Sequence, residues 1–244
     1  MVVIPVYDRN PTSGRAWVTI ALIIVNVGVF VLLQGGGQAS DQQQVTFTYE
    51  HAAIPCELLR QRPLTVGEID RDVCPDTQRG RPAFPDKHID LAVLVSMFLH
   101  VSWLHLGGNM LFLWIFGNNI EDRLGPLPYL GFYLLGGVVA AVAQLALDPT
   151  STVPVLGASG AIAAVMGAYL IWYPMARVLT FIGIIIPLPL PAFVVLGFWF
   201  VSQFFTQGAG DVAWMAHVGG FVFGAIVAWV LRRPKTIKPS PRYL

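Results

Sequence analysis

Charged residues are scarce in this 244-residue chain. Only 12% of its residues are charged and 55% are hydrophobic, whereas an average soluble domain is about 25% charged. A soluble globule of this size needs more charge to cover its surface, and a disordered chain contains fewer apolar residues. The net charge of +1 and the lack of a basic run interleaved with aromatic residues argue against nucleic-acid binding. The composition therefore predicts an all-α polytopic membrane protein, because a β-barrel would show alternating strands instead of continuous apolar runs.

The positions of the charged residues predict six membrane spans. Fifteen of them lie between Gly35 and Asp90, and the others separate six apolar stretches. Each stretch is about as long as a transmembrane helix requires, roughly 18 residues. Prolines interrupt the fifth stretch, so we interpret its first part, Val178–Leu190, as an interfacial approach to the span. The predicted spans are Ala16–Gln34, Leu91–Gly117, Leu127–Leu147, Leu156–Tyr173, Pro191–Thr206 and Ala213–Leu231.

The balance of charge predicts the orientation of these spans. The side that would hold both termini carries nine basic and three acidic residues, and the opposite side carries six basic and eleven acidic residues. Because basic residues mark the cytoplasmic side, both termini are expected there. We expect a cytoplasmic segment 1–15, a six-span domain 16–231 with an extracytoplasmic loop 35–90, and a basic cytoplasmic tail 232–244. The first span is too long for the apolar core of a signal peptide, and the compact core suits a bacterial plasma membrane.

Only two cysteines are present, Cys56 and Cys74, and both lie in the predicted outer loop. An oxidising compartment favours a disulfide between them. The bridge would close a loop of 17 intervening residues, which is worth about 3 kcal/mol in the chain-entropy model. Two unpaired thiols are the alternative, because the sequence does not fix their separation. No metal site is expected, since four suitable ligands do not cluster there.

Polar side chains inside membrane spans are costly and are therefore candidates for function. With the orientation above, five of them lie in the outer half of the membrane on three different spans, which predicts a shared cavity open to the outer side. Two of them are four residues apart and share one helix face, and a third would sit about a turn and a half above them on the same helix. The five are His100, His105, Asn109, Ser159 and His217.

Small residues adjoin Ser159 and His217. Stripes of small residues let helix backbones approach closely, so packing of the fourth span against the sixth would bring the serine and the histidine within hydrogen-bond reach. A stripe of this kind is more often a packing feature alone, and it is the combination with the polar residues that favours a reactive site. The glycines concerned are Gly157, Gly160, Gly220 and Gly224.

These residue types together can carry out acyl transfer. A serine hydroxyl is a weak nucleophile, so Ser159 needs an adjacent base. His217 would accept its proton and return it to the leaving amine. The oxyanion needs preorganised donors, for which Asn109, His105 and the Ser159 amide are available. No acidic residue lies near the site on the fourth or sixth span, so a dyad is predicted and the imidazole must be oriented by another group.

Three motifs resemble those of the rhomboid intramembrane serine proteases. His100–Asn109 reads HVSWLHLGGN, which is similar to the family's HxxxxHxxxN motif. Gly157–Gly160 reads GASG and resembles the GxSG nucleophile motif, and Ala216–Gly220 reads AHVGG and resembles AHxxG. Glu121–Gly125 is similar to the turn that follows the second span. The resemblance extends over Ala16–Leu231.

The resemblance implies an active endopeptidase with Ser159 as the nucleophile and His217 as the general base. It implies that His105 and Asn109 bind the oxyanion and that His100 is a nearby polar support. It also implies that the substrates are single-span transmembrane proteins and that the protein lies within the lipid bilayer. The fifth span is implied to act as a lateral gate. No cofactor is expected, and the oligomeric state is left open.

Two departures from the family pattern concern the loop and the base. Residues 35–90 contain no tryptophan, although many members carry a Trp-Arg pair there. Ala163 takes the position of a tyrosine that stacks on the catalytic histidine in some members, so what orients His217 stays open.

Two other functions compete with proteolysis. A catalytically silent member would bind transmembrane clients, but binding alone does not need a paired serine and histidine. A proton-coupled carrier would favour internal repeats and acid pairs in the spans, and the sequence shows neither.

Overall fold

The structure is a computed structural model that describes residues 3–77, 80–182, 186–205 and 213–232. Most of these residues are helical. In chain order the elements are β1 (Val3–Asp8), α1 (Trp17–Gly28) with a π-helical continuation (Val29–Leu33), a 3-10 turn (Gly35–Gly37), α2 (Asp41–His51), α3 (Pro55–Arg60), α4 (Val66–Arg71), α5 (Ile89–Ser96), α6 (Trp103–Leu124), α7 (Pro126–Leu147), α8 (Ser159–Trp172), β2 (Arg177–Ile182), β3 (Ile186–Pro191), α9 (Ala192–Gln203) and α10 (Trp214–Val230).

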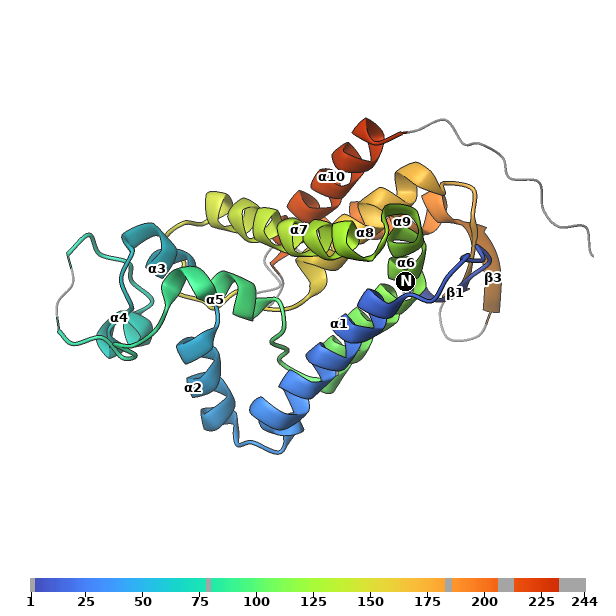
Figure 1. The fold of residues 1–244 in the computed structure, drawn as a ribbon. Helices are drawn as coiled ribbons and strands as arrows, with labels where there is room; N and C mark the ends of the chain where they lie inside the picture. The colour runs from blue at the N-terminus through green and yellow to red at the C-terminus, as the bar shows by residue number, and fades with distance from the viewer. Residues whose placement is uncertain (1–2, 78–79, 183–185, 206–212, 233–244) are drawn as a thin grey trace, which may run out of the picture.

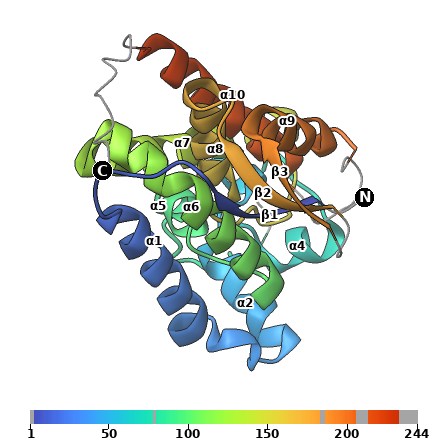
Figure 2. The ribbon, with the colours of Figure 1, turned by 90° about the vertical axis from the view of Figure 1, so that its right-hand side faces the viewer.

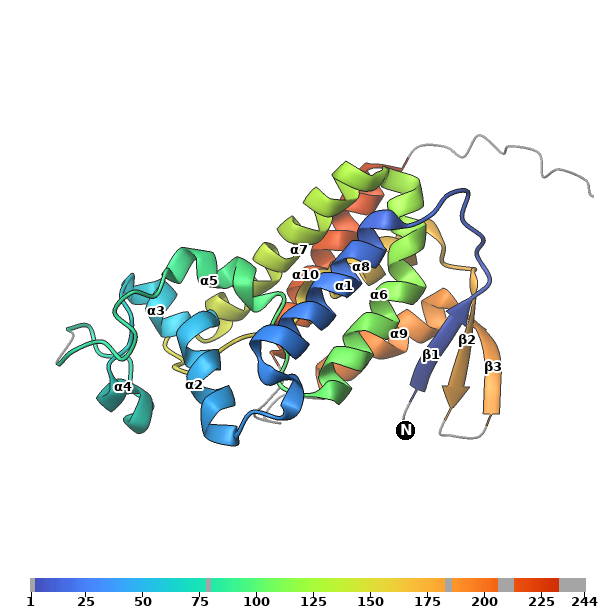
Figure 3. The same ribbon diagram turned by 60° about the horizontal axis from the view of Figure 1, so that its bottom comes forward.

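The long helices form a bundle with α8 at its centre. The short helices α2–α5 lie at one end of the bundle and the three strands lie at the opposite end (Figures 1 and 3). Figure 2 views the molecule from the end that carries the strands. Helix α8 packs against α6, α7, α9 and α10, and every residue from Gly160 to Tyr169 on it is buried. A helix that is apolar on all sides is expected at such a central position.

One helix in the described part of the chain, α7, is long and apolar enough to cross a membrane. The apolar helices Trp17–Leu33, α8, α9 and α10 each contain between 10 and 17 residues. The structure thus provides a helical bundle, whereas the six predicted crossings remain a prediction. Thr206, the predicted loop around Asp211 and the tail beyond Arg232 lie outside the described residues.

The predicted second span, Leu91–Gly117, is wrong as one continuous helix. The chain forms α5, leaves the helical conformation and re-enters a helix at Trp103. Ser102 sets this start, because its hydroxyl accepts the N–H of His105 at 3.1 Å and so satisfies one of the free donors of the first turn. His100 therefore lies in the break before α6 and not on the same helix as His105.

The second span also ends later than predicted. Helix α6 continues to Leu124, so Glu121 lies in its last turns, and the turn itself falls at Gly125, which has a φ of +85°. The buried Glu121 carboxylate accepts the N–H groups of Val18 and Thr19 at 2.9 and 2.8 Å. It therefore caps the N-terminus of α1, where a negative charge is favourable, and fixes α1 beside the end of α6.

The prediction of an all-helical chain was too narrow. The segment interpreted as an interfacial approach forms β2 and β3, which pair antiparallel, and β1 adds to the other side of β2. Successive N–H groups in a strand point to opposite sides, so prolines at alternate positions remove donors from one side only. Pro187, Pro189 and Pro191 follow this pattern in β3, which pairs on one side alone. Prolines of this kind suit an edge strand, because they block pairing with another chain.

Strand β1 is fixed to the bundle by Asp8. Its Oδ2 atom accepts a hydrogen bond from Asn119 on α6 at 2.8 Å and another from Tyr169 on α8 at 2.7 Å. Burial raises the pKa of this carboxyl above its usual value, and the two hydrogen bonds oppose that rise. Strand β1 is thereby tied to α6 and to the central helix α8.

The described residues of the predicted loop 35–90, called the outer segment below, form a small folded unit with its own core. Cys56 and Cys74 are joined by a disulfide and pack with buried Ile54 and Leu64. Lys87 forms a buried ion pair with Glu57 at 2.6 Å, and burial lowers the pKa of Lys87 although Glu57 opposes the shift. A disulfide, a buried ion pair and a few apolar side chains therefore hold together the described part of the predicted loop 35–90.

Candidate active site

Ser159 and His217 lie beside each other in the folded chain. Ser159 is the first residue of α8 and His217 lies in the first turn of α10. The distance from Ser159 Oγ to His217 Nε2 is 2.8 Å, and both side chains are half-buried. A serine hydroxyl and an imidazole at this separation are able to act as nucleophile and base in acyl transfer.

The glycines on α8 and α10 allow this approach. A Cβ atom on Gly220 would overlap the Gly160 carbonyl, and one on Gly224 would overlap the Ala164 carbonyl. On the other side of α8, a Cβ on Gly160 would lie 2.6 Å from the Cβ of Ala140 on α7. Because the backbones of α8 and α10 are in direct contact at these glycines, the start of α8 is held against the start of α10.

His105 reaches the site from α6. A Cβ on Gly157 would lie 2.9 Å from His105 Cε1 and 3.6 Å from Ser159 Oγ, so the imidazole of His105 lies against Gly157 close to the nucleophile. Gly157 has a φ of +120°, a conformation that suits glycine alone. His100 lies behind His105, with the two ring centroids 5.0 Å apart. The side chains of Ser159, His217 and His105 therefore lie around one point, and His100 packs behind His105.

Candidate donors for an oxyanion lie on α6 and at the start of α8. Asn109 lies one turn below His105 on α6 and is buried, and its Nδ2 atom has no hydrogen-bond partner within the described ranges. Ser159 begins α8, so the amide groups of its first turn have no acceptor inside the helix. These amides lie at the positive end of the helix dipole, which favours a negative charge. The arrangement can stabilise an anion that forms beside Ser159.

Gln203 was not among the residues predicted from the sequence, and it contacts His217 from α9. His217 Nδ1 lies 2.7 Å from Gln203 Oε1, and the ring of Trp199 lies 5.7 Å from the imidazole, centroid to centroid. Ala163 has no ring that could stack on the imidazole, whereas Gln203 and Trp199 on α9 both contact it. The signal was present in the sequence, because Gln203 is a polar residue within a predicted span, the same criterion that selected the other five residues.

An apolar groove of about 390 Å³ runs between α6 and α9. Trp199 lines this groove and also contacts His217, so the groove adjoins the site. Its other lining residues include Pro5, Phe112, Val195, Phe198 and Val201.

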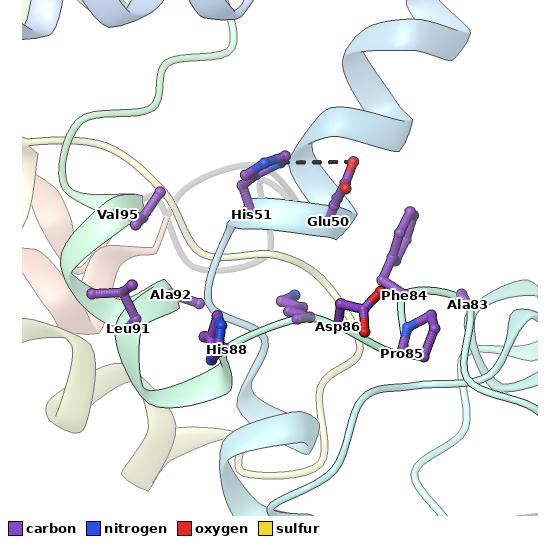
Figure 4. A pocket seen from close by; sticks show the side chains of 11 residues that line it. Glu50, His51, Ala83, Phe84, Pro85, Asp86, His88, Leu91, Ala92 and Val95 are labelled. Atoms are coloured by element: carbon purple, nitrogen blue, oxygen red, sulfur yellow. Dashed lines mark ion pairs between the residues drawn. The ribbon is translucent and has the colours of Figure 1, made fainter.

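A second pocket, of about 300 Å³, lies in the outer segment between α2 and the start of α5 (Figure 4). Its walls carry apolar side chains together with Glu50, His51, Asp86 and His88. None of its lining residues belongs to the Ser159 site.

Comparison with known proteins identifies the family. A model of the rhomboid domain matches residues 91–234, more than half of the chain. The chain is 28% identical over 153 residues to Rhomboid protein 1, mitochondrial, of Saccharomyces cerevisiae, which covers 59% of this chain and 42% of that protein.

Two similar bacterial proteins are named as proteases. Over 132 residues the chain is 32% identical to Rhomboid protease GlpG of Yersinia pseudotuberculosis, covering 54% of this chain and 45% of that protein. Over 145 residues it is 31% identical to Rhomboid protease GluP of Bacillus subtilis, covering 59% of this chain and 26% of that protein. The chain thus spans less than half the length of these relatives. Members of the family are membrane proteins, and the match over 91–234 includes all three motifs: the chain belongs to the rhomboid family.

Proposed function

We propose that the protein is an intramembrane serine endopeptidase that cleaves transmembrane proteins in or near their membrane segments. The observation that carries this proposal is the 2.8 Å contact between Ser159 Oγ and His217 Nε2. The names of two bacterial relatives, which call them rhomboid proteases, support the same activity.

The proposed reaction uses the two side chains in turn. His217 accepts the proton of the Ser159 hydroxyl as Oγ attacks the peptide carbonyl, and the resulting tetrahedral oxyanion is stabilised by hydrogen bonds. His217 then gives its proton to the amine, which leaves as the peptide bond breaks. Water, deprotonated by His217, hydrolyses the acyl-serine and releases the second product. Asn109, His105 and the first amides of α8 are the proposed oxyanion donors.

Six membrane crossings are part of the proposal. Large apolar side chains are exposed on the outer faces of four helices, and a soluble protein seldom exposes apolar surface so widely. Contact with lipid accounts for this surface, while α8 stays enclosed by its neighbours. The exposed residues include Ile24 and Leu32 on the first helical segment, Leu127, Leu135 and Val142 on α7, Phe193, Phe198 and Val201 on α9, and Val222, Ile226 and Trp229 on α10.

The proposed orientation puts both termini in the cytoplasm and the disulfide-bonded segment outside. One end of the bundle carries Asp122 and Arg123, which contact Ser13 and the ring of Trp172. The other end carries the outer segment and the start of α8. The inner end is the one whose connections carry the excess of basic residues, which supports this orientation. We place the protein in a plasma membrane, although three similar proteins are mitochondrial by name.

The proposed substrates are single-span proteins. The groove between α6 and α9 is apolar and adjoins the site, so a substrate helix can approach from the lipid without crossing a polar surface. A peptide bond reaches Ser159 only when it leaves the helical conformation, because carbonyl groups inside a helix are already hydrogen-bonded. Substrates with helix-breaking residues near the outer membrane edge are therefore the expected class.

Cleavage in reconstituted liposomes tests the proposed function. A panel of labelled single-span proteins with helix breakers near the outer edge would be incubated with the parent protein, Ser159→Ala and His217→Ala. We expect cleavage by the parent alone. Equal background in all three samples would contradict the proposal and would favour a catalytically silent protein that binds transmembrane clients.

A further inference from the structure

Gln203 is held between its own helix and the imidazole of His217. Its side chain is buried, with 6% of its surface exposed. Gln203 Nε2 donates to the Trp199 carbonyl at 2.9 Å, and Gln203 Oε1 lies 2.7 Å from His217 Nδ1. The two ends of one amide thus contact two different groups.

The first contact fixes which end of the amide faces the histidine. The opposite orientation would place the amide oxygen against the Trp199 carbonyl, where two acceptors would face each other. The hydroxyl of neighbouring Ser202 donates to the same carbonyl at 2.6 Å and can accept from Gln203 Nε2 at 3.3 Å. Gln203 Oε1 must therefore face His217, and an oxygen at that place can only accept.

The second contact then fixes the tautomer of the histidine. Because Gln203 Oε1 accepts, the hydrogen of neutral His217 is on Nδ1, and Nε2 carries the free lone pair. That lone pair faces Ser159 Oγ at 2.8 Å. A general base must present this lone pair to the hydroxyl, and the alternative tautomer would present a hydrogen instead.

We propose that Gln203 is the positioning residue of the site: it fixes the tautomer and orientation of His217 so that Nε2 accepts the Ser159 proton. This inference rests on the proposed peptidase function and supplies the orienting group that a dyad without a carboxylate needs. Trp199, one turn earlier on α9, supports the ring from the side. The tautomer and orientation of His217 thus depend on α9, a helix that carries neither Ser159 nor His217.

A pair of variants at one position tests the tautomer. Gln203→Leu keeps a similar volume but removes the acceptor, whereas Gln203→Glu keeps an oxygen that can accept from Nδ1. Gln44→Leu makes the same chemical change on α2, where the side chain of Gln44 donates to the Ala39 carbonyl, and serves as the control. Nitrogen NMR of protein labelled with 15N-histidine, assigned with His217→Ala, reports directly which nitrogen carries the hydrogen.

In the parent protein and in Gln44→Leu, we expect His217 in a single form that carries its hydrogen on Nδ1. In Gln203→Glu, the neutral fraction of His217 should have the same form. Gln203→Leu should show a mixture of both tautomers. An unchanged Nδ1–H form in Gln203→Leu would overturn the inference, and this readout holds even if no substrate is cleaved.

Kinetics separates this inference from the proposed function. For Gln203→Leu we expect about a 100-fold lower kcat, the low end of general-base effects, with KM unchanged and slower labelling of Ser159 by a fluorophosphonate. Gln203→Glu should recover most of the rate. Equal kcat for the parent and Gln203→Leu would overturn the role of Gln203 alone, whereas an inactive and unlabelled parent would overturn the peptidase proposal.

Discussion

Ser96 joins the outer segment to the loop that precedes Ser159. Its carbonyl accepts the N–H of Gly157 at 2.8 Å, and its hydroxyl accepts the N–H of Ala53 at 2.6 Å. Two further backbone hydrogen bonds follow the same path, from Cys56 N to Ser151 O and from Val155 N to Ala53 O. The disulfide-bonded segment therefore contacts the loop that places Ser159 at the start of α8.

Removing the disulfide should weaken both the fold and the site. Replacing Cys56 and Cys74 by serine frees the chain between them, and we expect a loss of about 3 kcal/mol from the chain-entropy effect. Because Cys56 N bonds the loop before Ser159, the cleavage rate should fall as well. Thermal unfolding in detergent and cleavage in liposomes measure the two effects. An unchanged unfolding temperature and cleavage rate in the double serine variant would show that the disulfide does not support the site.

Direct backbone contact between α8 and α10 predicts a sharp difference between two glycines. Gly224→Ala places a methyl group on the Ala164 carbonyl, so one helix must move, at a cost of about 1–3 kcal/mol or more. Gly131→Ala on α7 is the control, because no described residue outside the backbone of its own helix turn lies within 4 Å of the new methyl group and alanine favours a helix by about 1 kcal/mol over glycine. The unfolding temperature should fall for Gly224→Ala and rise for Gly131→Ala. Equal shifts in the two variants would contradict the direct contact between α8 and α10.

The Arg62–Glu68 pair predicts how the outer segment responds to acid. Burial alone would raise the pKa of Glu68, but hydrogen bonds from Arg62 and Thr65 bring it below the ordinary value of 4.5. Because the folded pKa is lower than the unfolded one, the stabilisation is complete above about pH 4.5 and is lost as the pH falls through the folded pKa. The outer segment should therefore loosen in acid.

Hydrogen exchange of the peptides around 56–76 measures this loosening. Protection in the parent protein should decline below about pH 4.5, after correction for the intrinsic exchange rate. Glu68→Gln has no charge to lose, so its protection should be lower at neutral pH and nearly flat across the same range. A parallel decline in both proteins would assign the acid response to another group.

Sequence patterns predicted the membership of the family, which the domain match confirms, and the approach of Ser159 to His217. Ser159 and His217 lie 58 residues apart, yet glycine spacing on two apolar stretches was enough to indicate that these stretches pack together. Such spacing lies within single stretches of the chain and can be read from the sequence alone.

The features that were missed depend on contacts across the fold. The break before Trp103 is stabilised by Gln34, whose side chain exchanges two hydrogen bonds with the backbone of His100. The sheet needs β1, which lies far from β2 in the chain. Gln203 acquires its role only because α9 lies against His217. Apolar periodicity cannot report such partners, since each is defined by a neighbour from a distant segment.

The most direct measurement of the central claim is the site of reaction with a fluorophosphonate. Purified protein in liposomes would be treated with the probe, digested and analysed by mass spectrometry, with His217→Ala and His51→Ala as paired variants. His51 lies on α2 and bonds the Phe47 carbonyl, outside the site. The account predicts an adduct on Ser159 in the parent and in His51→Ala, and at least a 100-fold slower reaction in His217→Ala, in keeping with the roughly 10²- to 10⁴-fold effect of a general base. Labelling of Ser159 at the same rate in His217→Ala, or an adduct elsewhere with Ser159 unmodified, would contradict the proposed nucleophile and base.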